Sequence, residues 1–171
     1  TRAAVVVLML LPLVYGALLG DTHERRVDEV ALYDTDSDRL AAIGHVVAQQ
    51  AEQAGRDDAV PPRVSVTTDL DEALDGADFV FSAVRVGGLH GRTCDERVAL
   101  DLGVLGQETT GPGGLAYGLR TIPVAVQVAE RVAALAPRAW VINFTNPAGM
   151  VTQAMQQVLG HLHTQGSIVG I

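Results

Sequence analysis

The sequence predicts an α/β protein built on a doubly wound, mostly parallel sheet. Short apolar runs typical of buried strands alternate with longer segments of helical periodicity through most of the 171 residues. The run DFVFSAV at 78–84 is apolar almost throughout, as expected of a strand that is buried on both faces. The length fits one domain, and 48% hydrophobic residues are enough for a sizeable core.

The first half of the chain contains three expected strand–helix units. Residues 2–20 are apolar after one arginine, a composition that a signal-peptide core or a short membrane segment also has. Pro12 and Gly16 interrupt this run and no small-x-small cleavage pattern follows, so we favour a strand at 3–8 and a helix that begins near Pro12. The other elements expected here are a strand at 29–33, a helix at 39–55, a strand at 64–69 and a short capped helix at 69–77.

The second half changes character after the strand at 78–84. Residues 85–118 contain nine glycines and several charges, so we expect functional loops with short helix between them. The remaining elements are a helix at 121–137, a strand at 139–144, a helix at 147–162 and a strand at 167–171. Together these units predict a Rossmann-like domain.

Composition argues against several classes of partner. A net charge of −8 and a pI of about 4.9 disfavour a nucleic-acid-binding surface, because phosphate backbones repel an acidic chain. We also predict no membrane partner. The single cysteine, Cys94, cannot form an internal disulfide, which indicates a reducing compartment, and we predict a cytoplasmic protein. No His/Cys pair has metal-binding spacing, so we assign no metal ligand in this chain.

Ligands of such sheets bind beyond the carboxyl ends of the strands, which makes Asp34 a candidate. A carboxylate at the end of the second strand can bind both hydroxyls of an adenosine ribose and so select NAD. A helix N-cap in DTDSD is an equally good interpretation of Asp34. The glycine-rich turn expected after the first strand is missing, because VLMLL stands at 7–11, and on this ground the chain should bind a dinucleotide poorly or not at all.

Two arginines follow the strand at 78–84. Arg85 and Arg92 are seven residues apart and could share one face of a helix, and arginine is suited to forked contacts with phosphate. Composition alone favours the alternative that they form surface ion pairs with Asp95 and Glu96.

Carboxylate and amide side chains mark two further segments. Glu108 lies in the glycine-rich run at 106–115, where a carboxylate is more often functional than on a helix face, although it could also serve a turn or a cap. The strand in VINFTNPAGMVT, 141–152, gives way to Asn143 and Asn146. Amides can both donate and accept hydrogen bonds, so this strand end is a candidate site as well.

These segments closely resemble glycoside hydrolase family 4, in particular its 6-phospho-β-glucosidases. GQETTGPGG and NFTNPAGMVT are the distinctive segments, and RVGGL is similar to the β-glucosidase branch rather than the α-glucosidase branch. The resemblance covers residues 27–171 and implies hydrolysis that depends on NAD and on Mn²⁺ or another divalent metal. In that chemistry C3 of the sugar is oxidised, the metal polarises the C3 carbonyl, the glycosidic oxygen leaves by elimination, water adds, and hydride returns.

The resemblance also implies roles by position. The substrate-binding residues would be Arg92 on the 6-phosphate, Glu108 on the sugar or on metal-bound water, and Asn146 on the sugar hydroxyls. The cofactor-binding residues would be Asp34 on the adenosine ribose, with Val84, Arg85 and Asn143 on the nicotinamide side. The substrate would be a phosphorylated disaccharide or an aryl 6-phospho-β-glucoside, and the enzyme a homo-oligomer, either dimer or tetramer.

Two departures from the family pattern limit what this chain can do. The glycine-rich turn is replaced at 7–11, and the metal-binding cysteine and acid aspartate expected directly after SIVGI do not follow, because the sequence stops at Ile171. The metal-binding histidine and the tyrosine base are expected further on. We therefore predict that residues 1–171 are the dinucleotide-binding, N-terminal part of a larger two-domain enzyme, truncated before the metal-binding and substrate domain. The catalytic residues are expected beyond Ile171, so this chain alone should hold no catalytic or metal residue and be inactive.

Two alternatives remain open at this stage. A lactate- or malate-type dehydrogenase shares the fold and an Asn-Pro at a similar strand end, but its arginine-bearing loop and catalytic histidine have no counterpart here. A degenerate Rossmann module that only binds a partner would explain the apolar segment at 7–11.

Overall fold

The computed structural model describes residues 1–6, 11–21, 26–56, 60–162 and 168–170. Its strands form one six-stranded sheet in the order β3-β2-β1-β4-β5-β6, and all neighbouring pairs are parallel. The strands are β1 (Arg2–Val6), β2 (Glu29–Tyr33), β3 (Arg63–Thr67), β4 (Phe79–Ser82), β5 (Trp140–Asn143) and β6 (Ile168–Gly170). This strand order confirms the predicted doubly wound, Rossmann-like fold.

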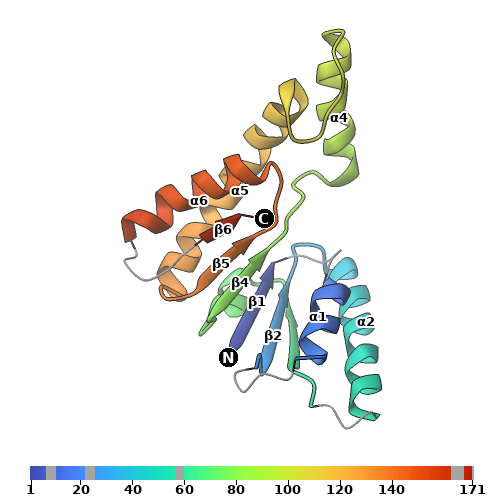
Figure 1. The fold of residues 1–171 in the computed structure, drawn as a ribbon, viewed down its shortest axis with the longest axis vertical. Helices are drawn as coiled ribbons and strands as arrows, with labels where there is room; N and C mark the ends of the chain where they lie inside the picture. The colour runs from blue at the N-terminus through green and yellow to red at the C-terminus, as the bar shows by residue number, and fades with distance from the viewer. Residues whose placement is uncertain (7–10, 22–25, 57–59, 163–167, 171) are drawn as a thin grey trace.

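The helices cover both faces of the sheet (Figure 1). They are α1 (Leu11–Leu19), α2 (Ser37–Arg56), α3 (Leu70–Leu74), α4 (Gly88–Asp101), α5 (Gly111–Leu135) and α6 (Ala148–Leu162). Helices α1 and α2 lie side by side over one face, and α5 and α6 over the other. Helix α4 packs on α5 and stands away from the sheet.

Two apolar cores follow from this layering, one on each face. Leu32 of β2 packs with Tyr15 of α1 and Val47 of α2, all fully buried. On the other face Val80 of β4 packs against α3, α5 and α6. Neighbouring strand residues point to opposite faces, so Phe81, directly after Val80, contacts the first core instead.

The N-terminal segment forms the strand and helix that we favoured over a signal peptide or membrane segment. Residues 7–10, which hold most of VLMLL, lie outside the described residues, so the poor dinucleotide binding expected from the missing glycines stays a prediction. Within the described part of the chain, no helix combines the length and the apolar character that crossing a membrane requires.

The last predicted strand, at 167–171, corresponds to β6, which is described over Ile168–Gly170 and pairs with β5. Ile171 itself lies outside the described residues. The expectation that the catalytic and metal-binding residues follow Ile171 is tested by nothing in the structure and stays a prediction.

The prediction of loops at 85–118 is wrong for most of that segment. It contains all of α4 and the beginning of α5, which starts at Gly111 and continues through Pro123 despite the backbone hydrogen bond that proline cannot make. Three glycines of α5, Gly113, Gly114 and Gly118, serve close packing. A Cβ on Gly114 would overlap the carbonyl group of Thr109, so only glycine allows the preceding loop to lie against the helix.

Candidate functional site

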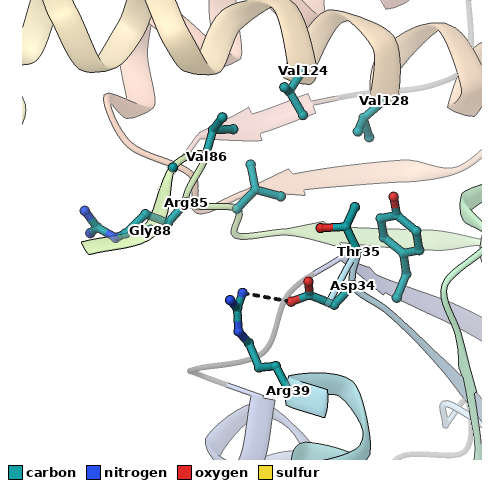
Figure 2. A pocket seen from close by; sticks show the side chains of 11 residues that line it. Asp34, Thr35, Arg39, Arg85, Val86, Gly88, Val124 and Val128 are labelled. Atoms are coloured by element: carbon teal, nitrogen blue, oxygen red, sulfur yellow. Dashed lines mark hydrogen bonds and ion pairs between the residues drawn. The ribbon is translucent and has the colours of Figure 1, made fainter. Parts of the chain in front are cut away.

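A cavity of about 330 Å³ opens at the carboxyl ends of β2 and β4 (Figure 2). Its lining comes from the last residue of β2, from the residues that follow β2 and β4, and from α5: Tyr33, Asp34, Thr35, Arg39, Val84, Arg85, Val86, Gly87, Gly88, Val124 and Val128. Strand β1 lies between β2 and β4. From β1 the chain adds β2 and β3 on one side of the sheet, and it then adds β4, β5 and β6 on the other side. The cavity therefore lies at the switch point where doubly wound sheets bind their ligands.

Asp34 is the buried carboxylate of this cavity. It directly follows β2 and is 7% exposed. Its Oδ1 accepts the backbone N–H of Asp36 at 2.9 Å, and its Oδ2 accepts Nη1 of Arg39 at 3.2 Å. An ionised carboxylate has about four lone-pair positions, so Asp34 keeps capacity for further donors.

Asp34 is not the N-cap of α2, because Asp36 holds that position. Oδ1 of Asp36 accepts the backbone N–H groups of Asp38 at 3.1 Å and of Arg39 at 3.0 Å, which is the bonding pattern of an N-cap at the start of α2. The bond from the Arg39 N–H is the main reason that the pKa of Asp36 lies below its usual value. Because Asp36 caps the helix, Asp34 is left facing the cavity.

The turn from Val84 to Gly88 forms the opposite wall. The Val84 N–H donates to Oγ1 of Thr145 at 2.9 Å, which ties this turn to the end of β5. Gly87 and Gly88 have φ angles of 81° and 57°, in the left-handed region that glycine adopts without strain, and α4 starts there. The structure thus brings Val84, Arg85 and Asp34, three of the four predicted cofactor residues, to one cavity.

Four ionised side chains, Arg85, Arg92, Glu96 and Glu108, form a charged cluster that adjoins the cavity through Arg85. Nη2 of Arg85 pairs with Oε1 of Glu108, and Nη1 of Arg92 lies 3.8 Å from Oε2 of the same carboxylate. Nε of Arg92 also donates to Glu96 at 2.9 Å, so the surface ion pair considered above exists as well. Glu96 first and Glu108 second raise the pKa of Arg92 above its usual value. The predicted substrate residues Arg92 and Glu108 therefore meet.

The two asparagines are not among the residues that line the cavity. Asn143 is fully buried. Its Nδ2 donates to Thr145 O at 3.3 Å and to Oγ1 of Thr152 at 3.0 Å, and its Oδ1 accepts the Thr145 N–H at 3.0 Å. Asn146 is half-buried and precedes a cis peptide bond to Pro147. The nicotinamide role of Asn143 and the sugar role of Asn146 therefore stay predictions.

Sequence reasoning missed Tyr117 and Arg120, which lie behind the turn at Val84–Gly88. The guanidinium carbons of Arg85 and Arg120 lie 5.4 and 5.6 Å from the centre of the Tyr117 ring. Burial raises the pKa of Tyr117, and the nearby Arg85 opposes this shift. The one available signal was Arg120 itself, the one charged residue in the first half of α5. Asp95, which we considered as a surface partner of Arg85 or Arg92, pairs with Arg120 instead.

No metal centre can be built from the described residues. They contain no group of three or more His, Cys, Asp or Glu side chains that could hold a metal ion.

The strand order and the cavity at the switch point define a Rossmann-like α/β domain. Residues 11–168 match the family model described as "Family 4 glycosyl hydrolase". The chain belongs to this family, as its resemblance predicted.

The curated relatives include both 6-phospho-β-glucosidases and 6-phospho-α-glucosidases. A "Probable 6-phospho-beta-glucosidase" of Bacillus subtilis is 49% identical over 118 residues, which are 69% of this chain and 26% of that protein. A "6-phospho-beta-glucosidase" of Escherichia coli is 47% identical over 140 residues, covering 81% of this chain and 30% of that protein. "6-phospho-alpha-glucosidase 1" of Lacticaseibacillus paracasei is 36% identical over 144 residues, covering 84% and 32%. The chain thus spans between 26% and 32% of the length of these relatives.

Solved structures agree with the family. The 6-phospho-beta glucosidase of Thermotoga maritima, determined with manganese, NAD⁺ and glucose-6-phosphate, has a TM-score of 0.86 and 29% identity, covering 100% of this chain and 40% of that one. A lactate dehydrogenase of Cryptosporidium parvum has a TM-score of 0.61 and 21% identity, covering 93% and 41%, which is a likeness of fold alone. Family membership decides against the dehydrogenase alternative.

Proposed function

We propose that this chain forms the dinucleotide-binding part of an enzyme that hydrolyses 6-phospho-β-glucosides with NAD and manganese or another divalent metal. The observation that carries this proposal is the cavity with Asp34 on one wall and Val84–Arg85 on the other, next to the charged cluster. The higher identity to β-glucosidases, 49% and 47% against 36% for the α-glucosidase, favours the β-anomer as substrate.

The described residues that line the cavity fit the ribose and a flat ring of a dinucleotide, whereas VLMLL at 7–11 is the one feature that argues against tight binding of its pyrophosphate. Asp34 can accept hydrogen bonds from both hydroxyls of an adenosine ribose, because only part of its acceptor capacity is used within the chain. Val124 and Val128 of α5 give the cavity an apolar side against which a flat ring can lie. Bound NAD supplies a hydride acceptor for the sugar and later returns the hydride.

The charged cluster fits an anionic group on the sugar. Arg85 and Arg92 each keep guanidinium donors that their carboxylate partners do not occupy, and both side chains are more than one-third exposed. A 6-phosphate can take these donors in a forked contact. Glu108, which pairs with Arg85, would then orient the sugar beside them, as the family resemblance implies.

A metal does not fit the described part of the chain, which offers no suitable group of ligands. The manganese named with the Thermotoga enzyme would need ligands from other residues of the intact protein, which we expect beyond Ile171. We also propose a cytoplasmic location, because Cys94 is an exposed free thiol, and a homo-oligomer, as the family resemblance implies.

The test of this function is hydrolysis of an aryl 6-phospho-β-glucoside by the intact enzyme, comparing wild type with Arg92→Ala. Loss of a charge-assisted contact worth about 1.5–3 kcal/mol should raise KM for the phosphorylated substrate by roughly 10- to 100-fold. Arg97→Ala, on the same helix and also exposed, is the matched control and should leave KM unchanged.

Three outcomes contradict parts of the proposal. A wild type without activity on the 6-phospho-β-glucoside overturns the function and leaves the partner-binding module as the better explanation. Preference for the α-anomer overturns the substrate assignment. If Arg92→Ala loses as much activity on unphosphorylated as on phosphorylated substrates, Arg92 does not bind the 6-phosphate.

A further inference from the structure

Arg120 ties three elements together from behind the cavity. Its Nη1 and Nη2 donate to Oδ1 and Oδ2 of Asp95 at 2.6 and 2.5 Å, and its Nε donates to Val86 O at 2.9 Å. Arg120 belongs to α5, Asp95 to α4, and Val86 to the turn after β4. Asp95 is 5% exposed, so its charge is neutralised by this bidentate pair rather than by water.

The chain around Arg120 leaves room for its guanidinium and for little else. A Cβ on Gly87 would lie 3.0 Å from Nε of Arg120, and a Cβ on Gly91 would lie 3.0 Å from Cζ. The glycines at the start of α4 therefore let the backbone close around the arginine. This degree of fit favours a role for Arg120 in setting the position of the turn.

Arg120 also lies next to both parts of the proposed site without belonging to either. The turn that it holds, Val86 to Gly88, lines the cavity. Arg120 and Arg85 also lie close to the same ring, that of Tyr117, and Arg85 pairs with Glu108 in the charged cluster. A shift of Arg120 would thus move the cofactor wall and the arginine that adjoins it.

We propose that Arg120 is a positioning residue: its bond to Val86 O, braced by Asp95, fixes the Val84–Gly88 turn in the position that a bound dinucleotide requires. The proposal rests on the proposed function, because it concerns the same cavity. Arg120 itself does not line that cavity, so it acts through the turn rather than by touching the ligand.

The test separates positioning from stability in the intact enzyme. In the double variant Arg120→Met/Asp95→Leu, apolar side chains replace the buried ion pair, a change that often leaves stability unaltered. We expect a Tm close to that of wild type, but a Kd for NAD about tenfold higher, because the bond to Val86 O is lost. Calorimetric titration with NAD and a thermal melt supply the two readings.

A second pair on the same helix serves as the matched control. Arg131 of α5 donates to both carboxylate oxygens of Asp71 at 2.7 and 2.5 Å, in the same forked geometry, but neither residue lines the cavity. The variant Arg131→Met/Asp71→Leu should bind NAD as tightly as wild type. If the first double variant does not fold, Arg120→Lys replaces it, since lysine keeps the charge beside Asp95 but has no fork to reach Val86 O.

The outcomes are distinguishable. Weaker NAD binding in a folded Arg120 variant, with the Arg131 variant unchanged, supports the proposal. NAD affinity equal to wild type in a folded Arg120 variant overturns it, since the pair would then serve stability alone. A wild-type enzyme that binds no NAD overturns the proposed function together with this inference.

Discussion

Removal of the bound dinucleotide from the intact enzyme is expected to abolish hydrolysis of an aryl 6-phospho-β-glucoside. The proton at C2 of the sugar is far too weak an acid to be removed unless C3 is first oxidised, so elimination stops when no hydride acceptor is present. Addition of NAD should restore full activity. Release of the aryl alcohol, followed before and after the protein is stripped of NAD, measures the effect.

A chelator provides the parallel experiment. Treatment with it should also remove activity, and manganese should restore it, because the proposed function depends on a divalent metal. A glycosidase that works through a carboxylate pair needs neither NAD nor metal and is the control. Undiminished turnover after both treatments would rule out an oxidative mechanism for this protein.

Asp34→Ala is expected to have the largest effect of any single substitution in the cavity. The loss of charge-assisted hydrogen bonds to the adenosine ribose should cost about 2–3 kcal/mol, which weakens NAD binding on the order of 100-fold. Arg39 keeps Asp36 as an ion-pair partner, 3.1 Å away, so the start of α2 should stay folded. Calorimetric titration of the intact variant with NAD measures the change.

Asp36→Ala is the matched control for this experiment. Asp36 also pairs with Arg39 but does not line the cavity, and it caps α2. Its loss should lower stability by about 1 kcal/mol and leave the affinity for NAD close to that of wild type. If Asp34→Ala and Asp36→Ala bind NAD equally well, Asp34 does not hold the ribose.

The part of the site at the strand ends could be predicted from the sequence, because parallel strands bring their carboxyl ends to one edge. Asp34 and Val84–Arg85 are 50 residues apart in the chain, yet the strand pattern put both at this edge, and the family resemblance assigned both to the cofactor. Apolar runs such as 78–84 located the strands for the same reason, since burial on both faces leaves a strong signal.

The Arg120–Asp95 pair could not be predicted, because it joins two helices whose relative position depends on tertiary packing. Neither residue stands in a local pattern that indicates its partner. The helical start of α5, where we predicted a loop, could not be predicted for a related reason. Glycine disfavours helix as an isolated preference, but here the close approach of Thr109 to Gly114 decides the structure. The bond from Asn143 to Thr152 likewise appears only once β5 and α6 are in place.

A crystal structure of the intact enzyme with NAD and glucose 6-phosphate tests the central claim most directly. The distances to measure run from the adenosine ribose oxygens to the carboxylate of Asp34, and from the phosphate oxygens to the guanidinium of Arg92. We predict hydrogen bonds of about 3 Å for both, with the two ligands in one continuous crevice at the carboxyl edge of the sheet. A dinucleotide bound away from Asp34, or a phosphate remote from the charged cluster, would contradict the claim.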